Sequence, residues 1–172
     1  MPRERCPMCR MSHHRFGRTR PLVALGRAPG RIAALIRRVP RRLVARRPAR
    51  GSWAINEVMC HLADAEVAPA FCIRKIASEP GSVISAWDQE RWAEGGRYRR
   101  TPVREAPETF ARLGAANLAS LGRRSAAPRS QHGRHPEYGR ITIRQLLEHW
   151  AEHDLNHLGQ MRAALASLDG RT

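Results

Sequence analysis

Apolar residues recur every three or four positions along four long segments of the chain, which is the spacing expected for one face of an α-helix. The four expected helices span residues 21–45, 54–78, 105–121 and 143–168. Alternating β-branched residues of the kind that form strands are scarce, and no internal repeat is visible. Two connections between the later segments, residues 79–104 and 122–141, are long and contain glycine and proline. The pattern therefore predicts an all-α domain, a four-helix bundle.

The fourth segment has the clearest start and end signals. Thr142 is followed three residues later by Gln145, a capping box in which each side chain bonds a free backbone N–H group of the other residue. Ile141 and Leu146 flank this box at positions that allow a hydrophobic staple. Gly170 follows the last apolar position, where glycine ends many helices. We therefore expect a helix that begins directly after Thr142.

Prolines predict breaks in the first two helices. The first segment should be interrupted around Pro29 and Gly30 and again at Pro40. In the second segment, Pro69 cannot donate a hydrogen bond to the carbonyl of Ala65, so a kink is expected there. Each of the two long apolar stripes is therefore expected to bend.

The start of the second helix lacks one half of a capping box. Glu57 occupies the position of the capping acid if residue 54 is the N-cap, but residue 54 is an alanine. Ser52 is the alternative cap. The helix is therefore expected to begin after Ala54 or two residues earlier.

Positive charge is concentrated in the first part of the chain. The 172 residues carry 31 basic and 15 acidic side chains, a net charge of +16. Residues 1–50 hold fifteen arginines and one acid, whereas residues 51–172 are nearly neutral. Every basic residue except Lys75 is arginine, which a codon preference in a GC-rich genome explains as well as selection for phosphate binding. We therefore divide the chain into a basic flexible extension, residues 1–20, and a helical domain, residues 21–172, and do not expect nucleic acid as the main partner.

Composition also bears on the compartment. Hydrophobic residues make up 42% of the chain and charged residues 27%, which fits neither a disordered, a collagen-like nor a membrane protein. The longest apolar runs are far shorter than the ~18 residues that a spanning helix requires. The apolar run that ends at Arg27 is too short for a secretory signal, and residues 1–50 contain a single serine, Ser12, unlike a mitochondrial transit peptide. We expect a cytoplasmic protein without a membrane partner.

Two of the four cysteines suggest a separate metal site near the start of the chain. Cys6 and Cys9 are followed by His14, a spacing that resembles the first three ligands of a zinc knuckle. The chain has Thr19 where the fourth ligand would be expected. Whether Cys6 and Cys9 bind metal is left open, and residues 1–20 are interpreted as an extension. The remaining cysteines, Cys60 and Cys72, are expected to be thiols.

Three histidines stand where the helical pattern calls for apolar residues. His153 and His157 are four residues apart, so both project from one face of the fourth helix. His61 lies on the inward face of the second helix. Three unpaired imidazoles in one core would cost free energy. A shared divalent metal ion accounts for all three and leaves one coordination position open for water or substrate.

Each histidine also has a simpler interpretation, because a single core histidine is more often hydrogen-bonded to a neighbour than bound to a metal. The pair on the fourth helix lacks the glutamate of the zincin motif, and His149 is another ligand candidate one turn earlier. Asp64 and Asp154 are candidates for orienting the imidazoles. Their alternative interpretation is that of ordinary surface carboxylates.

The segments that contain these histidines resemble motifs of the DinB-like superfamily. Residues 53–66, WAINEVMCHLADAE, resemble its second-helix motif, and residues 149–160, HWAEHDLNHLGQ, resemble its fourth-helix motif. Residues 138–142 resemble the lead-in to the fourth helix, and the Trp87-Asp88 pair resembles the loop after the second. The similarity covers about residues 21–168.

This resemblance implies a four-helix bundle in which His61, His153 and His157 hold a divalent metal: zinc, nickel, iron or manganese. Some relatives are transferases or isomerases that use a low-molecular-weight thiol, bacillithiol or mycothiol, and others are called metal-dependent hydrolases. Relatives often pair through exposed bundle faces, which implies a homodimer. The resemblance thus implies either a thiol-dependent transferase or isomerase or a metal-dependent hydrolase that acts on a small molecule. Catalytic residues beyond the metal ligands are not identified.

Two positions depart from the family pattern. Ala54 replaces the usual serine or threonine cap, and Gly114 stands where an arginine is often found. A contact of that arginine with an anion or a thiol substrate therefore does not carry over. The competing hypothesis is a non-enzymatic bundle whose basic arm binds nucleic acid or a protein partner and whose metal is structural.

Overall fold

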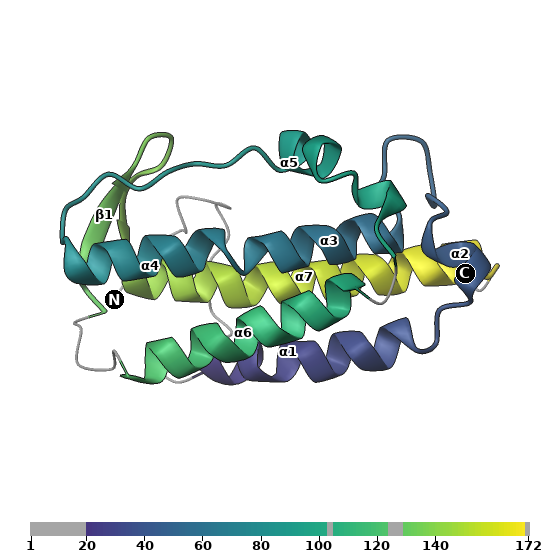
Figure 1. Ribbon diagram of the computed structural model, residues 1–172, viewed down its shortest axis with the longest axis horizontal. Helices are drawn as coiled ribbons and strands as arrows, with labels where there is room; N and C mark the ends of the chain where they lie inside the picture. Colours follow the sequence, from purple (N-terminus) through teal and green to yellow (C-terminus); the bar gives the residue numbers. More distant parts are fainter. Residues whose placement is uncertain (1–19, 103–104, 124–128, 171–172) are drawn as a thin grey trace, which may run out of the picture.

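The computed structural model describes residues 20–102, 105–123 and 129–170. Four long helical elements lie side by side in an elongated bundle (Figure 1). They are α1 (Arg20–Ile36), the broken helix formed by α3 (Ile55–Ala65) and α4 (Ala68–Ser78), α6 (Glu105–Arg123), and α7 (Ile143–Leu168). The predicted all-α four-helix bundle is confirmed. The predicted basic extension, residues 1–20, lies outside the described residues except for Arg20.

Each long helix packs against two neighbours. α1 contacts α6 and α7, α3 contacts the same two helices, and α4 contacts α7. The colours of Figure 1 show that α1 and α7 run in one direction, whereas α3, α4 and α6 run in the other. Because α4 and α6 are parallel, the connection between them must return along the length of the bundle. This requirement explains its length.

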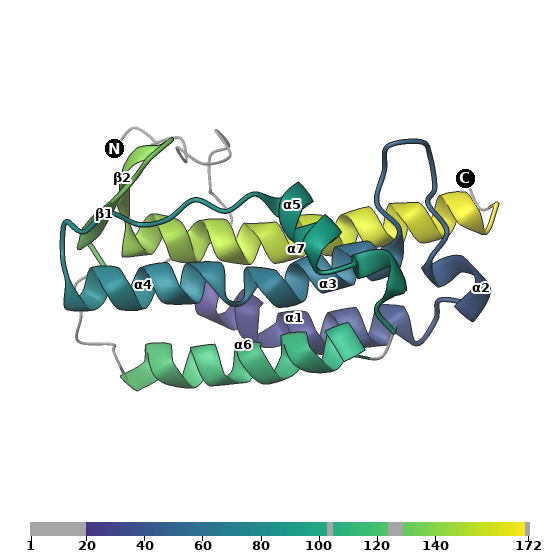
Figure 2. The same cartoon turned by 45° about the horizontal axis from the view of Figure 1, so that its top comes forward.

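The returning connection carries two short helices, α5 (Gln89–Gly95) and the 3-10 helix η1 (Tyr98–Arg100), which the apolar pattern did not predict. Asp88 caps α5, because its side chain accepts hydrogen bonds from the N–H groups of Glu90 and Arg91. Both views show the connection passing over the face formed by α3, α4 and α7 (Figures 1 and 2). One face of the bundle is therefore covered by irregular chain.

Helix α7 begins and ends as predicted. The Thr142 hydroxyl accepts the Gln145 N–H at 3.2 Å, and Gln145 Oε1 accepts the Thr142 N–H at 2.9 Å. Ile141 and Leu146, the predicted staple, are both buried. Gly170 has φ of 69°, a left-handed conformation that glycine adopts without strain.

The prolines act at two of the three predicted places. Helix α1 ends at Ile36, and the short helix α2 (Arg41–Val44) begins directly after Pro40. Pro69 lies in the first turn of α4, and the expected kink is a full break between α3 and α4.

The predicted interruption at Pro29 is wrong, since α1 continues through it. Pro29 removes one backbone hydrogen bond, but the helix buries an apolar stripe on both sides of it: Leu25, Ala28, Ile32 and Leu35. This burial outweighs the single lost bond.

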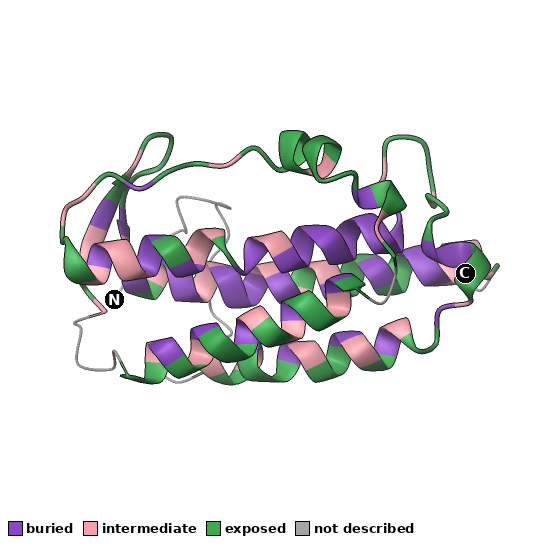
Figure 3. Cartoon of the chain, in the orientation of Figure 1, coloured by how far each residue is buried: buried purple, intermediate pink, exposed green. Residues whose placement is uncertain are grey.

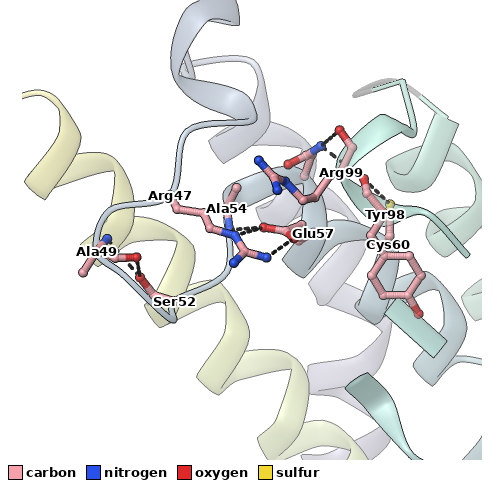
Figure 4. Close-up of polar contacts among 9 residues, drawn as sticks. Arg47, Ala49, Ser52, Ala54, Glu57, Cys60, Tyr98 and Arg99 are labelled. Carbon is pink, nitrogen blue, oxygen red and sulfur yellow. Dashed lines mark hydrogen bonds and ion pairs between the residues drawn. The ribbon is translucent and has the colours of Figure 1, made fainter. Parts of the chain in front are cut away.

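Helix α3 begins after Ala54, and no side chain caps it from that position. Glu57 supplies the other half of the box, because its carboxylate accepts the Ala54 N–H at 2.8 Å. The same carboxylate binds the Arg47 guanidinium through two bonds of 2.6 and 2.9 Å (Figure 4). Ser52 bonds to the backbone of Ala49 and does not cap the helix.

The last connection contains a β-hairpin that the sequence analysis missed. Strand β1 (His132–His135) pairs antiparallel with β2 (Gly139–Thr142). Gly133 is buried so closely against the hairpin's neighbours that an added Cβ would lie 2.9 Å from Ile76 and 3.0 Å from Ile84. Glycine is therefore required for the hairpin to lie against α4.

Buried residues face the interior along the bundle, and exposed residues cover the outside and most of α5 (Figure 3). The fully buried set includes Ile32, Ile55, Met59, Leu62, Ile76, Phe110, Ile141 and Met161. Among the residues described, no helix is long and apolar enough to cross a membrane.

Candidate metal centre

Helices α3 and α7 bring His61, His153 and His157 together. One ring nitrogen of each histidine lies within 4.8 Å of the other two. The shortest separation, between Nε2 of His61 and Nε2 of His153, is 2.9 Å. In zinc sites the metal–nitrogen bond is about 2.0–2.1 Å, so two nitrogens that share one ion lie at most about 4.2 Å apart, and small side-chain movements bring three nitrogens within 4.8 Å into that range. The predicted set is thus assembled from helices that lie far apart in the sequence.

His61 and His153 each also have a ring nitrogen that faces away from the cluster. Nδ1 of His61 and Nδ1 of His153 are buried, and neither has a hydrogen-bond partner among the described residues. Two imidazoles that share one hydrogen bond leave their remaining polar capacity unused, at a cost of ~1–3 kcal/mol per buried group. A cation bound by the Nε2 atoms would not reach these Nδ1 atoms, so the fit to a divalent cation rests on the 2.9 Å approach of the two Nε2 atoms, whose lone pairs one ion can bind together.

The three rings are uncharged at neutral pH. Burial, followed by the neighbouring imidazoles, lowers the pKa of His61 to about 2. Burial and the proximity of His157 lower the pKa of His153 to about 3. Burial also lowers the pKa of His157. A neutral imidazole has the free lone pair that a metal requires.

His61 is held between two tryptophans. Trp87, in the connection that crosses the site, stacks on its ring with a centroid distance of 5.3 Å and an interplanar angle of 14°. Trp53, just before α3, meets the same ring edge-on at 5.1 Å. The His61 side chain is 1% exposed. The tryptophans therefore fix this ring and limit its contact with water.

Other polar groups orient the α7 histidines. Nδ1 of His157 lies 2.7 Å from Oε1 of Gln160, so an Nδ1–H donated to this oxygen leaves Nε2 as the metal-binding atom. Oδ1 of Asp154 lies 3.6 Å from Nδ1 of His153, close to this ring but beyond hydrogen-bond distance, so the orienting role of Asp154 stays a prediction. The other predicted orienting residue, Asp64, instead accepts a hydrogen bond from the Tyr98 hydroxyl.

A cavity of about 370 Å³ opens beside the histidines. His61, His149 and His153 contribute to its wall next to the cluster, and residues of α4, the crossing connection and the hairpin complete it. A volume of this size accommodates a small organic molecule. The cluster therefore faces a space that a substrate can occupy.

A buried polar group lies behind the cluster. The Asn117 amide donates to the Glu66 backbone carbonyl at 2.8 Å and to its carboxylate at 3.0 Å. Burial, the largest cause, raises the pKa of Glu66 to about 8, and burial raises the pKa of Asp154 to about 8 as well. A Cβ added at Gly114 would lie 3.5 Å from the Glu66 carboxylate. Position 114 therefore faces a carboxyl group and supplies no positive charge.

A four-helix bundle with three histidines gathered beside a cavity, two of which line it, is the class that this fold and this site define. The family model described as the DinB superfamily matches residues 24–161. The chain belongs to the DinB superfamily.

Individual relatives agree with this assignment. The chain is 26% identical over 111 residues to a candidate metal-dependent hydrolase of Oceanobacillus iheyensis, an alignment that spans 64% of each chain. Its fold is similar to that of YfiT from Bacillus subtilis, with a TM-score of 0.81, 16% identity, and coverage of 92% of this chain and 93% of YfiT. YfiT is described as a candidate metal-dependent hydrolase with an unusual four-helix bundle topology. The four-helix bundle protein TT2238 is similar with a TM-score of 0.59 and 21% identity over 83% of this chain and 96% of its own.

Several residues around the site were not identified from the sequence as contributors. Gln160 lies in the resembling fourth-helix motif, three residues after His157, so its helical spacing was an available signal. The hairpin residues His135, Glu137 and Tyr138 line the cavity, but no local pattern connects them to α3 or α7. Their contribution depends on tertiary packing alone.

Proposed function

We propose that the chain is a divalent-metal-dependent hydrolase of a small molecule, with His61, His153 and His157 as the metal ligands. The observation that carries this proposal is the convergence of three ring nitrogens within 4.8 Å beside the cavity. The hydrolase names of the Oceanobacillus relative and of YfiT support the reaction class.

The chain's own residues prepare the site. The three neutral imidazoles offer lone pairs, Gln160 holds the His157 ring, and the two tryptophans keep His61 in place. Three protein ligands leave a fourth position for water or substrate. A divalent cation bound there supplies Lewis acidity, which lowers the pKa of a bound water and polarises a carbonyl oxygen. His61 is almost fully removed from water, which strengthens electrostatic interactions at its ring.

Replacing both α7 histidines tests the site. The variant with His153→Leu and His157→Leu should lose metal binding, because two of three ligands are gone. Its metal-free form should be at least as stable as the chelated wild type, since two imidazoles with unused polar groups become apolar side chains and only His61 keeps such a ring. Thermal unfolding with chelator and with excess zinc measures both effects: zinc should raise the midpoint of the wild type and leave that of the variant unchanged.

The control is His132→Gln, a hairpin histidine outside the cluster, which should retain the zinc response. If the leucine variant unfolds far below the chelated wild type and zinc shifts neither protein, the histidines are structural and the proposal fails. Titration of the cobalt-substituted protein with a low-molecular-weight thiol separates the two reaction classes. A change in the cobalt absorption spectrum at micromolar thiol would show that the thiol binds the metal. The proposed reaction would then be thiol-dependent transfer and not hydrolysis.

A further inference from the structure

The cavity beside the histidines is nearly free of charged side chains, although the chain as a whole carries a net charge of +16. Among the described residues that line it, none is lysine or arginine, and the single carboxylate belongs to Glu137. His135 does not add a positive charge, because its Nδ1 accepts the Glu137 N–H at 3.2 Å and burial lowers its pKa. An anionic group in this cavity would find no lysine or arginine among the described lining residues to pair with.

The walls carry more apolar than polar surface, and the polar lining residues include Ser85, Gln89 and four histidines. Trp87 and Trp150 contribute indole rings. Ala65, Ala68 and Pro69, at the break between α3 and α4, contribute short side chains that leave the space open. A compact, flat apolar body fits between such surfaces.

The exposed part of the lining is shared by the hairpin and the crossing connection, which contributes Ser85, Ala86 and Gln89. The rings of His135 and Tyr138 stack with a centroid distance of 4.5 Å, and Glu137 lies between them in the sequence. Glu137 and Tyr138 are exposed to solvent. A ligand whose inner end reaches the histidines therefore presents its outer end to a carboxylate.

The hairpin arginines, Arg134 and Arg140, are not among the lining residues, and four other arginines lie in a different hollow. Arg47, Arg97, Arg99 and Arg100 line a separate hollow of about 570 Å³, which also contains Trp53. Trp53 contacts the His61 ring from that direction, whereas Trp87 stacks on the same ring from the cavity. The positive charge is thus kept apart from the space next to the candidate ligands.

We propose that this cavity binds a substrate with a compact, aromatic-sized apolar body and no negative charge at its outer end, and that Glu137 excludes anionic analogues. This inference rests on the proposed function, because it assumes that the inner end of the substrate meets a metal at the histidines. It assigns the hairpin a role in selecting the substrate.

The test uses the cobalt-loaded protein and three matched benzohydroxamates, whose hydroxamate group anchors on a metal. They differ in the para substituent, which is methyl, aminomethyl or carboxylate. Calorimetric titration should give a dissociation constant for the carboxylate compound at least tenfold larger than those of the other two, which means weaker binding. Glu137→Gln should tighten binding of the carboxylate compound at least threefold and leave the methyl compound unchanged. Glu79→Gln removes the same charge at the end of α4, away from the lining, and should change neither.

A second variant tests whether the compounds occupy the apolar part of the cavity. Ala68→Phe should weaken all three compounds at least tenfold while cobalt content and the circular dichroism spectrum stay as in the wild type. Equal or tighter binding of the carboxylate compound by the wild type would overturn the inference. So would hydroxamate binding that Ala68→Phe leaves unchanged.

Failure of the proposed function is recognised separately, because the protein would then not retain cobalt. In that case the metal-free protein decides the inference, by the change in tryptophan fluorescence on adding para-methylbenzamide or para-methylbenzoate. Saturable binding of the amide without saturable binding of the benzoate supports the inference. Binding of the benzoate at equal or lower concentration contradicts it.

Discussion

Glu57 shows how much a single side chain at the start of α3 connects. Its carboxylate receives the Ala54 N–H from the helix terminus and the Arg47 guanidinium from the segment after α2. The side chain is 4% exposed, whereas that of Arg47 is 38% exposed. The start of the helix that carries His61 is thus fixed from both sides by one buried carboxylate.

Ala54→Ser should complete the capping box. A serine oxygen at this position can accept the Glu57 N–H, which Ala54 leaves without a side-chain partner. We expect the free energy of unfolding to rise by ~0.5–2 kcal/mol, with metal affinity unchanged. Urea denaturation and zinc titration measure the two quantities, and Ser52→Ala is the control that should have little effect. A loss of stability in Ala54→Ser would mean that this buried site has no room for the hydroxyl.

Arg47→Gln should reveal a pH-dependent contribution. Burial by itself raises the pKa of Glu57, but the hydrogen bonds from Arg47 and Ala54 and the charge of Arg47 outweigh burial and lower it below 4.5. A lowered folded-state pKa contributes stability that is present above the unfolded-state value and is lost as pH falls through the folded-state value. The variant should therefore be less stable than the wild type by roughly 1–3 kcal/mol at pH 7, since Glu57 keeps its burial and loses its partner.

This difference should shrink as the pH falls below 4.5, because protonated Glu57 no longer pairs with Arg47. Urea denaturation from pH 7 to pH 3 measures it. The neighbouring Arg46→Gln, which removes an exposed arginine, is the control. A difference between Arg47→Gln and the wild type that is constant over this range would exclude the pairing as its cause.

At the scale of elements, α1 illustrates a competition between local geometry and burial. A proline inside a helix costs about 3 kcal/mol relative to alanine, yet α1 runs through Pro29 because its apolar stripe packs against α6 and α7. Local preference alone favoured a break, and only the packed structure shows which effect dominates.

Pro29→Ala should stabilise the protein by roughly 1–2 kcal/mol, because it restores the bond to the carbonyl of residue 25, although it also increases the freedom of the unfolded chain. Gly30→Ala is the matched comparison: an added Cβ meets no atom within 4 Å, so a gain of ~0.5–1 kcal/mol is expected. Thermal and urea unfolding check both. If Pro29→Ala destabilises the protein while Gly30→Ala does not, the tertiary packing of α1 depends on the local geometry that the proline introduces.

The helices were predictable from the sequence to different degrees. The capping box placed the start of α7 at the correct residue, and the spacing of His153 and His157 predicted that they share a face. The hairpin was missed because its strands, HGRH and GRIT, carry few β-branched residues and are defined by pairing and by contact with α4. The cavity could not be predicted, since its walls come from four separate parts of the chain.

At the scale of the whole molecule, the buried core is formed within the described residues, from Leu25 to Leu165. Removal of residues 1–18 should therefore leave the thermal midpoint and the metal content per chain unchanged. Thermal unfolding and metal analysis after purification check this. Loss of half the bound metal would show that Cys6 and Cys9 hold a site of their own.

The parallel arrangement of α1 and α7 has a consequence for the nascent chain. Helix α1 packs against α7, yet more than a hundred residues of synthesis separate the end of one from the start of the other. Ribosomes add ~5–20 residues per second, so several seconds pass between the synthesis of α1 and that of α7. The apolar stripe of α1 lacks this packing partner during that time. During this interval α6 can cover only part of that stripe, which makes the unfinished bundle a client for chaperones until its last helix emerges.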